Sequence, residues 1–332
     1  MCNRNKSSEI QSLPPFTSVH PNVTGTIGGT PLVALQKLSS GTGGLVLLKL
    51  EYFSPGHSKK DRIALGMIRA SRTSGLLREG QAVVELTSGN TGTGLAIVCA
   101  AYGHPFIAVM SEGNSVERAR MMCALGAEVV LVSQCKGSQH GQVSGADLAR
   151  VNECVEQIVR ERGAFRADQF QLGSNPDAHA CGTGAELLEQ TGGRLDAFVE
   201  FVGSGGTFTG VSRTLKKTLP KVRCYVVEPR GAAILAGAPI TRPNHRIQGG
   251  GYSRTLPLLD TGLCDGYLQV EDEDAIAIAR RLAKDEGIFS GFSAGANVAA
   301  ALQLLKNQHL GGVVACLAAD SGLKYLSTNL YP

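Results

Sequence analysis

The chain contains no apolar stretch that approaches the roughly 20 residues a membrane-spanning helix needs. Its first residues, Met1–Pro15, include Lys and Arg but lack the apolar segment of a secretory signal. We therefore expect a soluble, cytoplasmic protein that has no membrane partner.

The charged and metal-ligating side chains also lack the groupings that mark several classes of protein. A net charge of +4 over 332 residues, with no basic block, argues against a nucleic-acid partner and leaves an anionic small molecule as an option. The nine cysteines include no C-x-x-C pair, and the seven histidines form no H-E-x-x-H spacing. We therefore expect reduced thiols and no metal site.

Glycine, in contrast, is abundant. It accounts for 42 of the 332 residues, well above the usual share of about 7%. This excess predicts many tight turns and close approaches of the backbone to a bound molecule.

Short β-branched segments alternate with amphipathic helices along the chain. Strands are predicted at Leu45–Leu50, Ala82–Leu86, Phe106–Met110, Val129–Val132, Ala197–Val202, Arg223–Val227 and Val313–Leu317. Helices are predicted at Lys60–Ser71, Gly92–Tyr102, Val116–Leu125, Leu148–Arg162, His179–Gln190, Asp274–Glu286 and Ala296–Lys306. This alternation predicts βαβ units with mostly parallel sheets. Two such series meet near residues 163–178, which predicts an α/β fold of two domains with a cleft between them.

The segment Ser54–Arg62 (SPGHSKKDR) is the first candidate for chemistry. Ser58 followed by Asp61 resembles a capping box, so a helix is expected to begin here. A lysine at the positive end of a helix is locally unfavourable, and such conflicts are tolerated mostly at functional sites. A partly buried lysine here would have a lowered pKa and serve as a nucleophile and base. The alternative is that Lys59 and Lys60 both point into solvent.

The segment Thr87–Gly92 (TSGNTG) follows a predicted strand and opens a helix. Its hydroxyls, its amide and the free N–H groups of a helix start would together bind a carboxylate. The alternative is an ordinary helix cap, which accounts for Ser88 or Asn90 but not for all four polar side chains.

Two further segments also lie where a helix begins. In Gly203–Thr207 (GSGGT), glycines would let the backbone wrap a phosphate at the helix N-terminus. A dinucleotide fingerprint is the alternative, but the spacing of Gly203, Gly205 and Gly210 does not fit it. In Gly291–Asn297, Ser293 considered alone is an ordinary N-cap.

Taken in order, and together with Ile27–Leu32 (IGGTPL) and Asp320–Leu326 (DSGLKYL), these segments resemble the fold-type II pyridoxal-phosphate enzymes. The resemblance is strongest to the cysteine synthase and cystathionine β-synthase family. It implies a tryptophan synthase β-like fold, with the cofactor in the cleft, in a homodimer. The smaller domain would span residues 46–162, and the larger would combine 1–45 with 163–332.

The resemblance also implies roles for individual residues. Lys60 would carry pyridoxal 5'-phosphate and act as the general base, and Asn90 would hydrogen-bond the phenolic oxygen of the cofactor. Ser293 would face the pyridine nitrogen, and Gly249 would lie beside the substrate amine. The cofactor phosphate would be held by Gly203, Ser204, Gly205, Gly206 and Thr207. The substrate carboxylate would be held by Thr87, Ser88, Thr91 and Gln169.

The activity implied is β-replacement on an O-activated L-serine, with O-acetyl-L-serine as donor and sulfide as nucleophile, giving L-cysteine. Three related activities stay open: condensation of serine with homocysteine, synthesis of a β-substituted alanine of the diaminopropionate type, and serine or threonine dehydration. A catalytically idle relative is disfavoured because Lys60, Asn90, Ser293 and the Gly203–Thr207 loop are all present.

Four features depart from the family pattern or divide its branches. Lys59 stands where the family usually has a small apolar residue, so either Lys59 or His57 attracts an acidic substrate or leaving group, or Lys59 is a solvated side chain. Ser293-Ala294-Gly295 and Tyr252 resemble cystathionine β-synthases, whereas the Asp320–Leu326 segment resembles cysteine synthases. The sequence therefore leaves the second substrate open.

Overall fold

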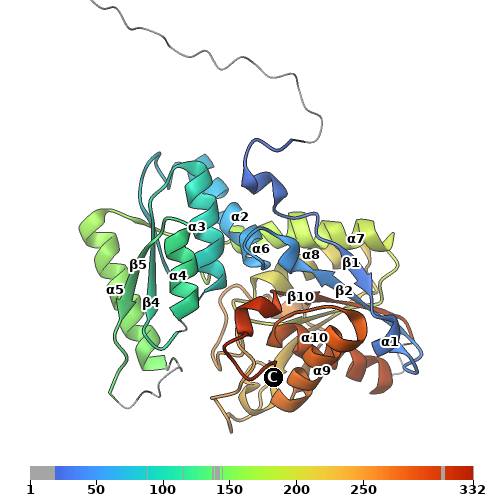
Figure 1. The fold of residues 1–332 in the computed structure, drawn as a ribbon. Helices are drawn as coiled ribbons and strands as arrows, with labels where there is room; N and C mark the ends of the chain where they lie inside the picture. The colour runs from blue at the N-terminus through green and yellow to red at the C-terminus, as the bar shows by residue number, and fades with distance from the viewer. Residues whose placement is uncertain are drawn as a thin grey trace, which may run out of the picture.

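A computed structural model describes residues 19–87, 89–114, 116–136, 138, 143, 145–307 and 311–331. Within these residues the strands form two sheets that lie side by side in Figure 1. Among the helices described, we find none whose length and apolarity would let it span a membrane. The eight cysteines in the described segments are free thiols, and Cys2 lies outside them.

The larger sheet has six strands in the order β1-β2-β10-β7-β8-β9. Its strands are β1 (Leu32–Ala34), β2 (Leu45–Leu50), β7 (Ala197–Phe201), β8 (Arg223–Pro229), β9 (Gly266–Val270) and β10 (Val313–Ala318). All neighbours are parallel except β1, which runs antiparallel to β2. The strands β7, β8 and β10 are buried along almost their whole length, as expected where helices cover both faces of a parallel sheet.

Helices cover the two faces of this sheet. One face carries α1 (Gln36–Ser39), α9 (Asp272–Glu286) and α10 (Phe292–Asn307). The other carries α7 (Ala185–Thr191) and α8 (Gly206–Thr218). Ahead of α7, α6 (Ser174–His179) continues through one π-helical turn, Ala180–Gly184, so that a single run of helix contains the whole predicted His179–Gln190 helix and begins earlier.

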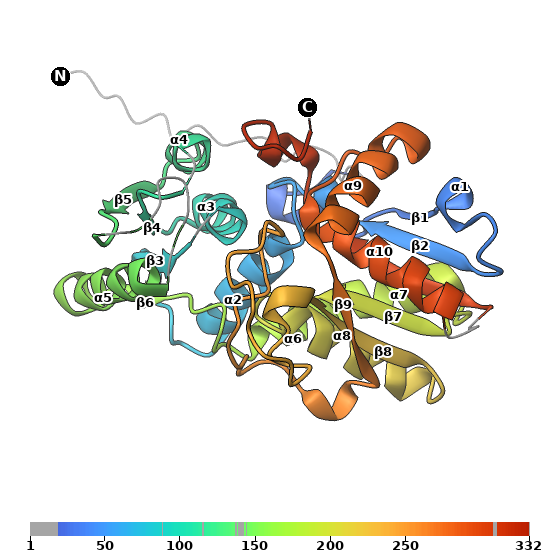
Figure 2. The same cartoon turned by 90° about the horizontal axis from the view of Figure 1, so that it is seen from below.

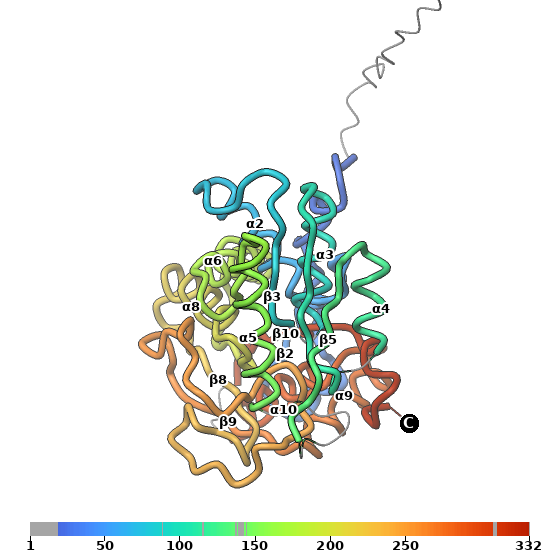
Figure 3. Tube along the Cα trace, turned by 90° about the vertical axis from the view of Figure 1, so that its left-hand side faces the viewer, coloured from blue at the N-terminus to red at the C-terminus, as the bar shows by residue number. Residues whose placement is uncertain are grey.

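The smaller sheet has four parallel strands in the order β5-β4-β3-β6. They are β3 (Val83–Leu86), β4 (Phe106–Ser111), β5 (Glu128–Val132) and β6 (Phe165–Arg166). Figure 3 shows α5 (Gly145–Arg162) on one side of β3 and β5, with α3 (Asn90–Tyr102) and α4 (Val116–Ala124) on the other. The apolar core divides in the same way between the two faces.

The helix α2 (Lys60–Thr73) lies between the two sheets, as Figures 1 and 2 show, and it packs against both α3 and α6. Short 3-10 turns complete the order: Val23–Thr26, Glu51–Phe53, Arg230–Ala232, Thr261–Leu263 and Gly322–Tyr325.

The predicted α/β fold of mostly parallel sheets is confirmed. Three strands, β1, β6 and β9, were not predicted. The smaller domain was predicted to begin at residue 46, whereas β2 pairs along its whole length with β10 of the larger sheet. Register explains this correction, because Leu45 to Leu50 lie opposite Val313 to Ala318. The domain limits themselves stay a prediction.

Candidate active site

Lys60 is the first residue of α2, and the segment before it is tied to the chain that follows β10. Ser58 forms an antiparallel bridge with Asp320, and the Lys59 N–H donates to the Ala319 carbonyl at 2.8 Å. The Ser58 hydroxyl accepts from the Lys60 N–H at 3.3 Å. The start of α2 is therefore fixed at the carboxyl end of the larger sheet, where ligands of parallel α/β folds usually bind.

The predicted capping box at this helix start is wrong. The Asp61 carboxylate turns back and accepts from the Gly56 N–H at 2.6 Å, and the N-cap, Lys59, makes no side-chain capping bond. A Cβ atom on Gly56 would lie 2.3 Å from Asp61 Oδ1, so this turn requires glycine. Burial raises the pKa of Asp61 to about 6.

A buried ionic network anchors α2 two residues further on. The Arg62 guanidinium donates to both carboxylate oxygens of Glu51, at 2.6 and 3.0 Å, and to both of Glu186, at 2.6 and 2.8 Å. Lys49, fully buried on β2, reaches Glu186 at 2.8 Å. Bidentate Arg–carboxylate pairs hold a fixed geometry, so this network fixes α2 against β2 and α7.

The Lys60 side chain is partly exposed, and its amine lies in a group of charges. Burial lowers the pKa of Lys60 to about 7, and the neighbouring Lys59 ammonium lowers it further, while Glu200 and Asp320 oppose the shift. Near pH 7 a substantial fraction of this amine is unprotonated, which is the form that acts as a nucleophile or base. The predicted lowering of the Lys60 pKa is thus reproduced by its surroundings.

Lys59 does not lie where the sequence analysis placed it. Its side chain is buried rather than solvated, and its ammonium forms an ion pair with the buried carboxylate of Glu200 on β7. The prediction that Lys59 is solvated is therefore wrong. The alternative, that Lys59 attracts an acidic substrate, is disfavoured because its charge is already paired. His57 is exposed.

The segment Gly203–Thr207 links β7 to α8 and lies against neighbouring backbone. Gly205 adopts φ +85°, a conformation that favours glycine, and serves as the N-cap of α8. A Cβ atom on Gly206 would lie 2.2 Å from Asn175 Oδ1, and one on Gly203 would lie 2.6 Å from the Gly249 carbonyl oxygen. The first N–H groups of α8 have no partner within the helix and are available to an anion.

Asn90 is the first residue of α3, and its amide is held from both sides. Its Nδ2 donates to Asp320 Oδ2 at 2.6 Å, and its Oδ1 accepts from Lys324 Nζ at 2.6 Å. Asp320 Oδ2 also accepts from the Tyr325 hydroxyl at 2.6 Å. This arrangement fixes which end of the amide carries the N–H groups, and it leaves the second Nδ2 hydrogen for a ligand.

The Thr87 hydroxyl caps the start of α3. Thr87 Oγ1 accepts from the Gly92 N–H at 2.8 Å and from the Gly89 N–H at 3.2 Å. Ser88 itself lies outside the described residues. Because its oxygen already accepts twice, the Thr87 hydroxyl would meet a substrate carboxylate as a donor.

A continuous series of hydrogen bonds joins the Thr87–Thr91 segment to the Gly203–Thr207 segment. Thr91 Oγ1 donates to Gln169 Oε1 at 2.7 Å, and the Gln169 carbonyl accepts from Asn175 Nδ2 at 2.7 Å. The same Asn175 nitrogen donates to Ser204 Oγ at 3.1 Å. The structure therefore brings together two segments that lie far apart in the sequence.

Ser293 and Gly249 complete the set of predicted site residues. Ser293 is buried in the first turn of α10, next to Gly291, where an added Cβ would lie 2.3 Å from Asp320 Oδ1. Gly249 has φ +95° and borders Gly203. Next to it, the Gln248 side chain accepts from Arg118 Nη2 of α4 at 2.7 Å, a contact that spans the two halves of the molecule.

Sequence reasoning missed several residues that organise this site, above all Glu200, Asp320, Lys324, Asn175 and His179. Buried His179 contacts Thr207 Oγ1 through Nε2 at 3.1 Å, and burial holds its pKa well below the usual range. A signal did exist for Glu200, because it is the single charged residue in the otherwise apolar strand Ala197–Phe201. A charge buried in a parallel strand requires a partner.

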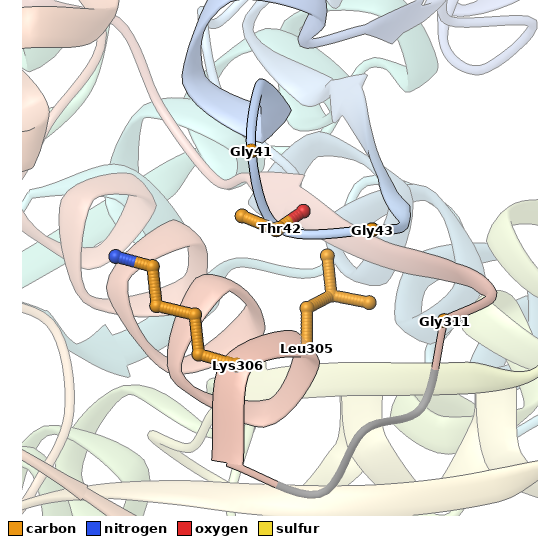
Figure 4. Close-up of a pocket in the computed structure, with 6 residues that line it drawn as sticks. All are labelled: Gly41, Thr42, Gly43, Leu305, Lys306 and Gly311. Carbon is orange, nitrogen blue, oxygen red and sulfur yellow. The ribbon is translucent and has the colours of Figure 1, made fainter.

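One surface hollow lies away from this site. It has a volume of about 370 Å³ and is lined by Gly41, Thr42 and Gly43 on one side and by Leu305, Lys306 and Gly311 on the other (Figure 4). Lys306 is near the end of α10, about 20 Å along the helix axis from Ser293. The hollow is therefore separate from the candidate active site.

Comparisons with known proteins agree with this geometry. The model of a family described as pyridoxal-phosphate dependent enzyme matches residues 23–320. A cysteine synthase from Staphylococcus aureus (strain Mu50 / ATCC 700699) is 41% identical over 312 residues, which cover 93% of this chain and 96% of that protein.

Two solved structures share the fold over almost their whole length. A crystal structure of O-ureido-L-serine synthase matches with a TM-score of 0.85 and 39% identity, covering 94% of this chain and 95% of that one. The O-acetyl serine sulfhydrylase isoform 3 from Entamoeba histolytica matches with a TM-score of 0.87 and 34% identity, covering 97% and 94%.

Proposed function

The chain belongs to the family of pyridoxal-phosphate-dependent enzymes, and we propose that it replaces the β-substituent of O-acetyl-L-serine by sulfide to give L-cysteine. The fold-type II architecture that the sequence resemblance implied is confirmed by the same matches. The relatives include a cysteine synthase and an O-acetyl serine sulfhydrylase, which supports this donor and this nucleophile.

The observation that carries the proposal is the convergence of two of the predicted segments, Ser54–Arg62 and Thr87–Gly92, on Asp320 after β10. Asp320 binds the amide of Asn90, bridges to Ser58 and faces the amine of Lys60. Lys60 and Asn90 are the two residues proposed to meet the reactive end of the cofactor, and they come from segments about 30 positions apart in the chain.

The described residues fit pyridoxal 5'-phosphate. The Gly203–Thr207 segment offers a cradle in which a side chain at Gly203 or Gly206 would collide with its surroundings. The N-terminus of α8, with the hydroxyls of Ser204 and Thr207, would hold the phosphate group, and Ser293 would face the pyridine nitrogen. When bound, the cofactor supplies an electron sink that makes the α-proton of an amino acid acidic and its β-substituent a leaving group.

The remaining chemistry falls to the protein. Lys60 Nζ would hold the cofactor and, once released by the incoming amine, would take the α-proton, since part of this amine is unprotonated near pH 7. The substrate carboxylate would be bound by Thr87, Ser88, Thr91 and Gln169, and its amine would lie beside Gly249. Homodimeric assembly and a cytoplasmic location belong to the same proposal.

The test is the visible absorption spectrum of the purified protein before and after O-acetyl-L-serine, and again after sulfide. We expect a yellow protein whose band changes with the donor and returns with sulfide. The Lys60→Ala variant is expected to lose this behaviour and to drop in kcat/KM by about 10³-fold or more. Lys217→Ala, which changes an exposed lysine at the end of α8, is the matched control and is expected to behave as wild type.

Other outcomes would correct specific parts of the proposal. A yellow protein that ignores O-acetyl-L-serine would refute this donor and direct the test to O-phospho-L-serine and L-serine. Release of pyruvate without an added nucleophile would indicate a dehydratase. A colourless protein that does not take up pyridoxal phosphate would overturn the cofactor assignment.

A further inference from the structure

We propose that Lys59 and Glu200 act as one positioning unit for Lys60: their buried ion pair holds the first turn of α2 against β7 and balances the second positive charge beside the reactive amine. This inference rests on the role proposed for Lys60. It predicts that neither member of the pair is tolerated without the other.

Both charges are enclosed by protein. The exposed fraction is 8% for Lys59 and 1% for Glu200, and the two side chains form an ion pair across 141 positions of sequence. Glu200 lies in the interior of the larger sheet, because β7 pairs with β10 on one side and β8 on the other. An isolated charge there would be strongly unfavourable, so each residue depends on its partner.

The pair is connected to three of the four segments that the sequence analysis singled out. Lys59 belongs to the first segment, and Glu200 lies three residues before Gly203. The amide of Asn297, which ends the Gly291–Asn297 segment, donates to Glu200 Oε2 at 3.5 Å and to the Leu317 carbonyl at 3.0 Å. Asn297 follows Ser293 by one helical turn on α10. The carboxylate of Glu200 thus joins the start of α2 to α10.

The pair determines where Lys60 points. Adjacent residues on a helix project about 100° apart, so a lysine held at position 59 fixes the rotation of the helix start and the direction in which position 60 projects. The Lys59 N–H adds a second restraint through the Ala319 carbonyl at 2.8 Å. The amine of Lys60 is then left on the side of Asp320.

Three charged groups act on Lys60: Lys59 at the N-cap of α2, Glu200 on β7 and Asp320 after β10. The titratable His179 on α6 is also near, and burial holds its pKa well below the usual range. Lys59 lowers the pKa of Lys60, whereas Glu200 and Asp320 raise it. Removal of Lys59 alone and removal of Glu200 alone should therefore move the pKa of Lys60 in opposite directions.

The experiment compares Lys59→Met, Glu200→Gln and the double variant with wild type. Apoprotein is prepared from the full-length enzyme, and the rate at which the yellow band forms on mixing with pyridoxal phosphate is followed from pH 6 to 9. Because only the unprotonated amine reacts, the midpoint of this profile reports the pKa of Lys60. Thermal unfolding of each protein supplies an independent measure of coupling.

We expect the midpoint to move up by about 1 pH unit in Lys59→Met and down by a similar amount in Glu200→Gln. The double variant should lie near wild type and should recover at least half of the Tm lost by the worse single variant. A merely structural role would lower Tm without opposite shifts. Lys216→Met, which breaks the surface ion pair to Asp265, is the control and should leave the midpoint unchanged.

Two results would overturn the proposal: midpoints that move in the same direction or not at all, and a double variant no better folded than the single variants. If the single variants do not fold, the recovery of a yellow, folded double variant carries the test alone. The Lys60→Ala variant distinguishes a failure of the proposed function from a failure of the positioning role. A yellow band in Lys60→Ala would refute the role of Lys60 itself. If Lys60→Ala loses the band while Lys59→Met and Glu200→Gln keep the wild-type midpoint, only the role of the Lys59–Glu200 pair is refuted.

Discussion

The two sheets are built from the same alternation of strands and helices, but the six-stranded sheet has four interior strands and the four-stranded sheet has two. In the six-stranded sheet β7 is buried at every position, and β8 and β10 at all but the first. In the four-stranded sheet β4 is equally buried, but the edge strand β5 is exposed or half-buried throughout, and Leu131 on it is 52% exposed. Of the nine residues of α4 only Met122 is buried.

The proposed site residues divide along the same line. The six-stranded half provides the cradle for the cofactor phosphate and Ser293. The segment before Lys60 is fixed to this half by the bridge of Ser58 with Asp320 and by the ion pair of Lys59 with Glu200. The four-stranded half provides Thr87, Asn90 and Thr91, and Asn90 reaches the other half through its hydrogen bond to Asp320. We infer that the six-stranded half, the base, is the more rigid and holds the cofactor. The four-stranded half, the lightly fastened half, binds the substrate carboxylate and closes on it. Closure stays a prediction.

The largest expected effect tests the difference in burial directly. Phe198 on β7 is fully buried, so Phe198→Ala should lower the free energy of unfolding by about 3–5 kcal/mol. Leu131→Thr on β5 should change it by less than about 0.5 kcal/mol. Urea unfolding of the two variants and wild type measures both values. Equal losses would show that the two halves are packed alike.

The second prediction concerns how α2 is fixed to the base. Burial raises the pKa of Glu186, but the hydrogen bonds and charges of Arg62 and Lys49 outweigh it and bring the pKa down to about 2. Glu186→Gln should therefore cost about 3 kcal/mol at pH 7, since it leaves buried cations under-compensated.

The pH dependence of the stability lost in Glu186→Gln follows from the direction in which the pKa of Glu186 is shifted. A carboxylate with a lowered folded-state pKa contributes stability that is complete above its unfolded value near 4.5 and is lost as the pH falls toward 2. The gap between wild type and Glu186→Gln should thus narrow from pH 5 to pH 3 in urea unfolding. Glu189→Gln, an exposed neighbour on α7, is the control. A gap that is independent of pH would contradict the ionic account.

Much of this architecture could be predicted from the sequence, because the strands that matter are continuous apolar segments. Leu45–Leu50 was predicted at its observed bounds, and the start of α2 at Lys60 was predicted correctly. β1 and β6 have three and two residues, too few for any periodic pattern, and β9 mixes exposed and buried positions. The pairing of β2 with β10 was not predicted, because β10 lies more than 260 positions later in the chain.

The residues of the candidate site were predicted from their local segments, and their partners were not. Lys60, Asn90 and Gly203–Thr207 lie in motifs that a sequence displays. The contacts of Asn90 with Asp320 and of Lys59 with Glu200 join positions 230 and 141 apart, so nothing local reveals them. Burial of Lys59 was mispredicted for this reason, because a lysine beside a helix start is solvated unless a carboxylate from elsewhere reaches it.

The third prediction tests the lightly fastened half at its contact with the substrate. Thr91→Val keeps the shape of the side chain but removes the hydroxyl that donates to Gln169. If this hydroxyl also takes part in binding the carboxylate, kcat/KM for O-acetyl-L-serine should fall by about 10–100-fold with little change in Tm. Thr93→Val is the matched control, since the Thr93 hydroxyl donates to the Gly89 carbonyl within the same helix. Similar losses of kcat/KM in Thr91→Val and Thr93→Val would show that the effect arises from a change in α3 and not from substrate binding.

The smallest expected effect comes from the contact that spans the two halves. Arg118 on α4 donates to the Gln248 side chain at 2.7 Å and covers Gly89, where an added Cβ would lie 2.8 Å from Arg118 Cδ. One such exposed hydrogen bond is worth about 1 kcal/mol, so Arg118→Ala should raise KM for the donor roughly fivefold and change kcat little. Arg120→Ala, an exposed arginine on the same helix, should leave KM unchanged. Because the contact joins the lightly fastened half to the base, a rise in KM alone indicates that Arg118 stabilises the closed arrangement. A fall in kcat with constant KM would instead assign Arg118 to the chemical step. The division into a six-stranded half that carries the chemistry and a four-stranded half that binds the substrate carboxylate would then be wrong.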